Sequence, residues 1–556
     1  MHYLQAVESK SNPMEIFKSI TIWSICLLFS VQSTLGQDQA WFTLDVSKNN
    51  WKPEFELVGK QLKYQGNDNR LGKILQKYRV YQFSETQKGV VGTEVGQRFF
   101  VRADDGNLMT ELLNGASHLF NGGELWSEDE MKIYEPNDYG LTSTIGSNVG
   151  AQAVLDYMDV LGLPQAWYYT TGSPEVVLGV ADGKLDTLHP EFAGRVKVYQ
   201  LSTASNGHGS GVATVIGAKG DNGEGVPGVC YDCDLAATRY GDFRSFKQLN
   251  ELAENGIRVI NCSWVSSRQF ESGQEAVNDM FAKGTLLVAG AGNKPWSENQ
   301  GEQFFYPASY DKVISVSAVM YKYEKPEDNI RYQKSGKPFV ENIRGFVGRT
   351  AGFKDHKIGN SLRIYPVSTA TLNTEVDLVA PAVGVLQGSA LILEGKVQYL
   401  DKTAATSVAA PFVTGTIGLM LSLYPCLPTE EIEPILKLTA TNLDDIEANR
   451  PYRGNYGAGM LHSGRAVKLV HDLFNSDAVA RISNQRFDRW EFPIRSFSKE
   501  VCFNDIQFSG SADLDLSAKQ AITLEPGTHL KPGSQGSIHL KIDTGMEQSC
   551  ALDTKK

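Results

Sequence analysis

Apolar runs of strand length alternate with helical periodicity between about residues 155 and 470, and this alternation restricts the fold more than any other feature of the sequence. Strand-like runs lie at 176–181, 259–262 and 285–289, and helical spacing lies at 246–253 and 276–281. Strands that alternate with helices favour a parallel sheet covered by helices on both faces. We therefore predict an α/β fold with a doubly wound, mostly parallel sheet.

The segments that flank this region have other patterns. Residues 37–133 combine alternating apolar stretches with turns, which predicts a small α+β unit, and a turn-rich linker begins at residue 134. Residues 480–556 are rich in Ser and Gly, with alternating apolar positions and Pro-Gly turns. This pattern predicts a small all-β module, and we find no repeat array in it. The main domain is expected at 134–475.

The first 36 residues, 1–36, have the pattern of a signal peptide. Lys18 precedes an apolar stretch at 20–31, and small residues end the pattern at Gly36. The stretch is short for a bilayer span, although an uncleaved anchor is the alternative. Translation from Met14 is the alternative to a long leader. We predict a secreted or cell-surface protein that has no membrane segment after the signal is removed.

Composition and cysteines narrow the class of protein further. The chain is 41% hydrophobic and 21% charged, as in ordinary globular proteins, and its net charge of −11 argues against a nucleic-acid surface. Six cysteines follow the signal, an even number that permits disulfides in an exported chain. Cys230 and Cys233 form a CxxC, which we interpret as a small disulfide loop because zinc would need a second pair. Cys502 and Cys550 are candidates to close the tail, with the pairing left open.

Four polar residues stand where this fold would gather functional groups. Asp182 ends one strand-like run, Asn293 closely follows another, and His208 and Ser407 each begin a segment of helical character. The carboxyl ends of parallel strands carry the sites of α/β sheets, and a helix N-terminus favours developing negative charge. Taken singly, Ser407 is better explained as a helix N-cap than as a nucleophile. The glycines around His208 do not follow the dinucleotide fingerprint, which argues against a phosphate loop.

The order Asp182, His208, Ser407 along the chain resembles that of the subtilisin-like serine proteases. The sequence from Ala405 to Gly415 is similar to the serine signature of that family, and the resemblance extends over about 138–470. Supporting matches lie at 306–308, 313–319, 377–381 and 457–461. The resemblance implies that residues 37–133 are a propeptide, which assists folding, inhibits the enzyme and is removed by self-cleavage.

The resemblance also implies an acyl-enzyme mechanism. Ser407 would attack a peptide carbonyl, His208 would accept its proton, and Asp182 would orient the imidazole. Asn293 would donate a hydrogen bond to the oxyanion, together with the backbone N–H of Ser407. No metal takes part in these steps, and the expected enzyme is a serine endopeptidase.

Protein or peptide substrates are expected to bind as an added strand between two walls of a cleft. One wall is implied to be Ser263, Trp264 and Val265, and the other Gly290, Ala291 and Gly292. A monomer is expected, with its own propeptide as intramolecular inhibitor. Calcium stabilises many relatives, and the loop 221–224 offers oxygen ligands, although a plain solvated turn is the preferred interpretation.

The sequence departs from the family pattern at several positions. Ala405, Lys184 and Val265 replace glycines, Gly211 stands where a second histidine is common, and 320–373 is longer than usual. The last of these is expected to be a surface insertion that either borders the cleft or is inert. One alternative function is therefore an inactive homologue that binds peptides or partners. Another alternative is a surface protein in which the C-terminal module carries the function, through attachment or export. A simple spacer is the competing interpretation of that module.

Overall fold

The computed structural model describes residues 39–47, 51–86, 97–146, 148–204, 207–393, 396–402 and 405–554. The expected signal peptide, including Met14 and the apolar stretch at 20–31, lies outside these ranges.

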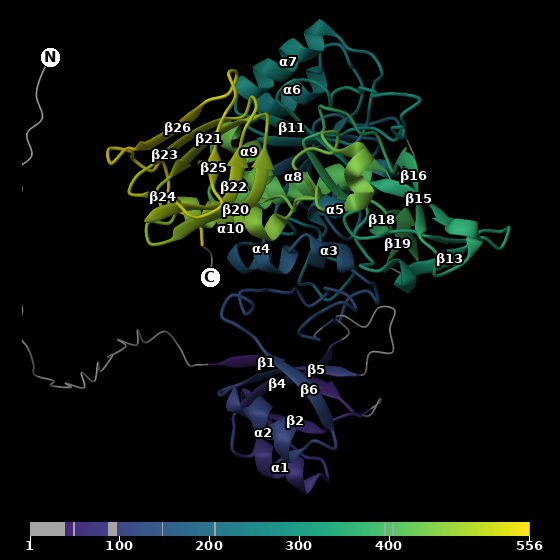
Figure 1. Ribbon diagram of the computed structural model, residues 1–556, viewed down its shortest axis with the longest axis vertical. Helices are drawn as coiled ribbons and strands as arrows, with labels where there is room; N and C mark the ends of the chain where they lie inside the picture. Colours follow the sequence, from purple (N-terminus) through teal and green to yellow (C-terminus); the bar gives the residue numbers. More distant parts are fainter. Residues whose placement is uncertain are drawn as a thin grey trace, which may run out of the picture. The chain divides into compact units, whose positions relative to one another are not determined.

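A seven-stranded sheet forms the centre of the main domain. Its strand β11 is labelled in Figure 1. Its order is β17-β12-β11-β10-β7-β9-β8, and all of its neighbouring pairs are parallel. The strands are β7 (Val177–Asp182), β8 (Val196–Val198), β9 (Asp234–Arg239), β10 (Val259–Cys262), β11 (Leu286–Gly290), β12 (Val313–Val319) and β17 (Leu378–Pro381). The predicted α/β fold with a mostly parallel sheet is confirmed.

Helices cover both faces of this sheet. The helices α5 (His208–Gly217) and α8 (Thr406–Leu423) share one apolar cluster with the sheet, and α6 (Lys247–Glu254) and α7 (Glu271–Ala282) share a second cluster with it. The shorter α3 (Asp156–Val160) and α4 (Leu163–Tyr169) belong to the first cluster, as do α9 (Thr429–Thr439) and α10 (Ser463–Phe474). Each strand can therefore be apolar on both sides, as the sequence runs indicated.

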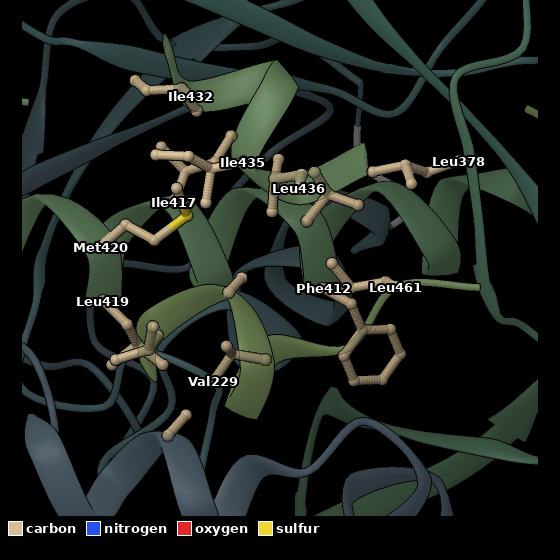
Figure 2. Close-up of a cluster of buried hydrophobic side chains, with 14 of the residues drawn as sticks. Val229, Leu378, Phe412, Ile417, Leu419, Met420, Ile432, Ile435, Leu436 and Leu461 are labelled. Carbon is tan, nitrogen blue, oxygen red and sulfur yellow. The ribbon is translucent and has the colours of Figure 1, made fainter. Parts of the chain in front are cut away.

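Helix α8 is apolar on all sides because other elements surround it. Figure 2 shows its side chains Ile417 and Met420 near Ile435 of α9, and Phe412 near Leu461. Within the part of the chain that the structure describes, α8 is the one helix long and apolar enough to cross a membrane, and 94% of it is buried inside the protein. This burial identifies it as a core helix.

Residues 40–125 form a separate α+β sheet with its own apolar cluster. Its strands have the order β2-β3-β4-β5-β1-β6, and all neighbouring pairs are antiparallel. The elements are β1 (Ala40–Val46), β2 (Phe55–Val58), β3 (Gln61–Tyr64), α1 (Asn69–Leu75), β4 (Val80–Thr86), β5 (Arg98–Ala103), α2 (Asn107–Gly115) and β6 (Phe120–Leu125). Without the β2–β3 hairpin, the chain follows a β-α-β-β-α-β path.

The insertion at 320–373 contains two pairs of antiparallel strands and packs on the segment that follows Asn293. The Trp296 backbone N–H donates to Ser368 Oγ at 2.7 Å, and Thr371 Oγ1 donates to the Lys294 carbonyl at 2.9 Å. The elements of the insertion are η1 (Pro326–Asn329), β13 (Ile330–Tyr332), β14 (Pro338–Val340), β15 (Gly348–Phe353), η2 (Lys354–His356) and β16 (Leu362–Ser368). The strands β18 (Val385–Leu393) and β19 (Lys396–Lys402) form a hairpin after β17. A short 3₁₀ helix, η3 (Glu447–Tyr452), lies between α9 and α10.

The C-terminal strands form a coil of successive turns, an arrangement that the sequence pattern did not predict. The chain alternates between two parallel sheets, so that Ala480, Val501 and Ile522 stack 21 residues apart. The strands are β20 (Val479–Phe487), β21 (Glu491–Ser496), β22 (Glu500–Phe508), β23 (Asp513–Ala518), β24 (Ile522–Leu524), β25 (His529–Leu530) and β26 (Ile538–Ile542). Their inward side chains belong to the same apolar cluster as α8, α9 and α10.

Two disulfides link cysteines in this part of the protein. Cys230 and Cys233 are bridged, as the CxxC suggested, whereas Cys550 is bridged to Cys426 and not to Cys502. Cys502 is buried within the coil, and the chain end returns to the end of α8, where the Asp553 N–H donates to the Leu423 carbonyl. Spacing along the sequence gave no sign of that return.

Replacing Cys426 and Cys550 together by Ser should lower the free energy of unfolding by about 2–5 kcal/mol, because the bridge closes a loop of more than a hundred residues. Urea titration of a Ser407→Ala background measures this without self-digestion. Cys502→Ala is the matched control and should cost about 1 kcal/mol. If Cys502→Ala lost about 2–5 kcal/mol of unfolding free energy while the double variant lost none, the Cys426–Cys550 pairing would be contradicted.

Candidate active site

Register in the sheet brings three predicted residues to one edge. Ala181 on β7 pairs with Cys262 on β10, and Cys262 pairs with Ala289 on β11. The residues that follow are Asp182, Ser263 and Gly290, so they lie side by side at the carboxyl ends of adjacent strands.

Asp182 and His208 are hydrogen-bonded. The distance from His208 Nδ1 to Asp182 Oδ1 is 2.7 Å, and the Gly183 N–H donates to the same oxygen at 2.6 Å. Asp182 is buried, whereas the His208 side chain keeps 29% of its surface exposed. A Cβ on Gly209 would lie 2.4 Å from the Gly183 carbonyl oxygen, so glycine at that position permits α5 to approach the Asp182 loop closely. The imidazole is thus anchored at Nδ1.

Ser407 is the second residue of α8, and Asn293 is fixed to the residue before it. The Thr406 N–H donates to Asn293 Oδ1 at 2.8 Å, with Thr406 Oγ1 at 3.3 Å from the same oxygen. Since the amide oxygen of Asn293 is taken, Nδ2 remains as its donor. Helices α5 and α8 are in contact, which brings the elements that carry His208 and Ser407 together.

Ser263, directly after the end of β10, holds the backbone of Ser407. Its Oγ donates to the Ser407 carbonyl at 2.9 Å and accepts from Asn261 Nδ2 at 2.9 Å. The sequence reasoning assigned no role to Thr406 or Asn261. Thr406 lies inside the recognised serine signature, but nothing in the sequence showed which side chain it would meet.

The two predicted walls differ in what they expose. Trp264 Nε1 donates to the Ala181 carbonyl at 2.8 Å. The Trp264 ring packs against the ring of Phe243, with 5.3 Å between the ring centroids. Ala291 is 1% exposed and belongs to an apolar cluster behind the wall. A Cβ on Gly290 would lie 2.8 Å from Thr406 Oγ1. Val265, which is 40% exposed, is therefore the main apolar side chain that these walls present.

The departures from the family pattern leave the four groups in place. Ala405 has φ −146° and ψ 131°, an extended conformation that any residue adopts, so its methyl group causes no strain. Lys184 is exposed, and its backbone N–H donates to the Ala204 carbonyl. A Cβ on Gly211 would make only ordinary contacts with Gln387.

The loop 221–224 uses its side-chain oxygens within the protein. Asp221 accepts from Tyr134 Oη at 2.6 Å and from the Asn137 N–H at 2.9 Å, and Asn222 Oδ1 accepts from the Glu224 N–H. Among the described residues, no group of three or more His, Cys, Asp or Glu side chains is arranged for a metal. The nearby Glu191 is buried, its Oε2 has no hydrogen-bond partner, and burial raises its pKa to about 7. Burial therefore disfavours the ionised form of Glu191.

Comparison with known proteins identifies a family. Residues 173–459 match the family described as the subtilase family, Peptidase_S8. Subtilisin DY of Bacillus licheniformis is 28% identical over 309 residues, which cover 53% of this chain and 91% of that protein. The thermophilic serine proteinase of Bacillus sp. strain AK1 is 28% identical over 58% of this chain and 66% of its own length. The major intracellular serine protease of Bacillus subtilis strain 168 is 25% identical over 47% of this chain and 73% of its own length.

Proposed function

Because the chain belongs to the subtilase family and is a serine-type endopeptidase, we propose that Ser407, His208 and Asp182 form its catalytic triad and that Asn293 stabilises the oxyanion. The hydrogen bond between His208 Nδ1 and Asp182 Oδ1 carries this proposal. It orients the ring with Nδ1 as the donor to Asp182, so that Nε2 is the nitrogen that accepts the proton during catalysis.

In the first half-reaction, Ser407 Oγ bonds to the carbonyl carbon of the substrate while its proton passes to His208 Nε2. The tetrahedral intermediate collapses when that proton passes to the leaving nitrogen, and the carbon–nitrogen bond breaks. In the second half-reaction, water gives its proton to Nε2 and attacks the ester, which releases the new carboxylate and regenerates Ser407. Asp182 stabilises the imidazolium in both halves and stays ionised.

Negative charge on the substrate oxygen develops beside Asn293 and the start of α8. The Asn293–Thr406 bond turns the amide so that Nδ2, not Oδ1, is the group left for the oxyanion. The backbone N–H of Ser407 lies in the first turn of α8, where it has no partner within the helix. These donors are held before the substrate arrives, which is why they stabilise the transition state effectively.

The inactive-homologue alternative loses its main support. It rested on substitutions near the motif residues, and the extended conformation of Ala405 removes the strain that a methyl group there would otherwise cause. The catalytic steps need no cofactor, and calcium, where bound, would act only on stability. The proposed enzyme acts as a monomer.

Export and self-processing are further parts of the proposal. Glu135 is buried and accepts from Ser143 Oγ at 2.7 Å and from the Thr144 N–H at 2.9 Å, so residues from about 134 onward are built into the main domain. Residues 40–125 have their own core. This division supports a propeptide at 37–133 that inhibits the enzyme until it is cut off, and a mature protein that acts on protein or peptide substrates outside the cell.

Expressed in an oxidising compartment, the wild-type chain should lose the segment before about residue 134 and label with a fluorophosphonate. Ser407→Ala should keep that segment and stay unlabelled, because it lacks the nucleophile. Intact-mass spectrometry and N-terminal sequencing measure the cut. If the variant is cut at the same position, self-cleavage is wrong. If the folded wild type does not label, the binding-protein alternative takes precedence.

Asn293→Ala should lower kcat by about a hundredfold to a thousandfold with little change in KM, because one oxyanion donor is lost; the measured precedent for this size is itself a subtilisin. Asn293→Asp keeps the acceptor for Thr406 but has no donor, and it should be at least as slow. Initial rates on a peptide substrate measure both. An unchanged kcat in both variants would contradict the role of Asn293.

A further inference from the structure

The cleft walls meet the segment that precedes β12. Ser266, directly after the first wall, pairs with Tyr306 in an antiparallel bridge, with N–H···O distances of 2.7 and 2.9 Å. The bridge fixes the backbone of this segment against the end of the wall. Because the bridge is antiparallel, Val265 lies opposite Pro307 and Phe305 lies opposite Ser267. Val265 and Phe305 are thus diagonal neighbours on the same face, a separation that large side chains can span.

The ring of Phe305 also lies against the second wall. Gly292 has φ +117°, and a Cβ on it would lie 2.7 Å from Phe305 Cδ2 and 2.8 Å from Thr371 Oγ1. The ring edge is thus in contact with the backbone of Gly292. No larger residue is compatible with this position, both for its φ and for the space that the ring takes.

This space is where one substrate side chain must be. The attacked carbonyl has to reach Ser407 and Asn293, and Asn293 directly follows Gly292. The residue that supplies this carbonyl, on the N-terminal side of the scissile bond, therefore has its Cα beside Gly292 and the Ser263–Val265 wall. A large side chain at that residue would need the volume that Phe305 and the exposed Val265 occupy.

We propose that Phe305, together with Val265, fills the pocket for the residue whose carbonyl is attacked, so that the enzyme selects Gly, Ala or Ser at this position and rejects aromatic and long aliphatic side chains. The proposal rests on the triad and cleft proposed above. It assigns a specificity role to Phe305, which takes no part in the bond-breaking steps. Pocket size discriminates by roughly 10–200-fold per methylene, so rejection of a benzyl group should be strong.

The test uses succinyl-Ala-Ala-Pro-X p-nitroanilides, in which only X changes, with X as Ala, Leu or Phe. The wild type should prefer Ala to Phe by about 100-fold or more in kcat/KM. Phe305→Ala should raise kcat/KM for the Phe substrate at least about tenfold while the Ala substrate changes little, and Val265→Gly should add to this gain. Phe304→Ala is the matched control, because Phe304 is the exposed neighbour and should leave the preference unchanged.

A second measurement needs no variant. Mass spectrometry of peptides from denatured casein digested by the wild type should place small residues directly before the cuts. Cuts after Phe, Leu or Tyr would overturn the proposal, as would an unchanged preference in folded Phe305→Ala. Failure of the proposed function has a different signature: no substrate is cleaved and the wild type does not label with a fluorophosphonate. An enzyme that labels and cleaves, but does not distinguish Ala from Phe, contradicts only the pocket assignment.

Discussion

The burial of α8 is the constraint on which the rest of the main domain depends. Every residue of Thr406–Leu423 is buried except Ser407, which is the residue that has to meet substrate. An apolar helix of this length is stable only when strands and helices surround it completely. The strands of the sheet, α5 and α10 contact α8, and α9 and the C-terminal coil belong to the same apolar cluster. The position of Ser407, the proposed nucleophile, therefore follows from the packing of the domain.

Apolar burial has no direction, so it does not by itself set the rotation of α8 or the placement of its first turn. Hydrogen bonds do. The Thr406 N–H is held by Asn293, and the Ser407 carbonyl is held by Ser263, which come from the ends of two different strands. The same bonds orient the amide of Asn293. Sheet register, helix placement and oxyanion donor are thus coupled, and a shift in one would misplace the others.

The sequence was sufficient for those parts that repeat a simple physical pattern. Strand-like and helical periodicity predicted the parallel sheet, and the serine signature predicted which residues would lie at strand ends and helix starts. Contacts between distant loops were not predictable in this way. Cys426 meets Cys550 only because the coil returns to α8, and Phe305 meets Gly292 only because Ser266 pairs with Tyr306. The coil itself was missed because its inward alternation is also that of a meander, and its turns differ in length.

Residues placed by the sheet and residues placed by contacts between loops also differ in how freely they can be substituted. Asp182 and Gly290 end paired strands and Ser263 directly follows one, and a shift of one residue in that pairing would turn every strand side chain to the other face. Phe305 lies on a connection between strands, and its own removal breaks no ladder and no hydrogen bond to the nucleophile. Specificity can therefore vary through this connection while the geometry of peptide-bond cleavage stays fixed by the sheet. Loops on a rigid scaffold are where such variation is tolerated, and the filled pocket is an instance of it.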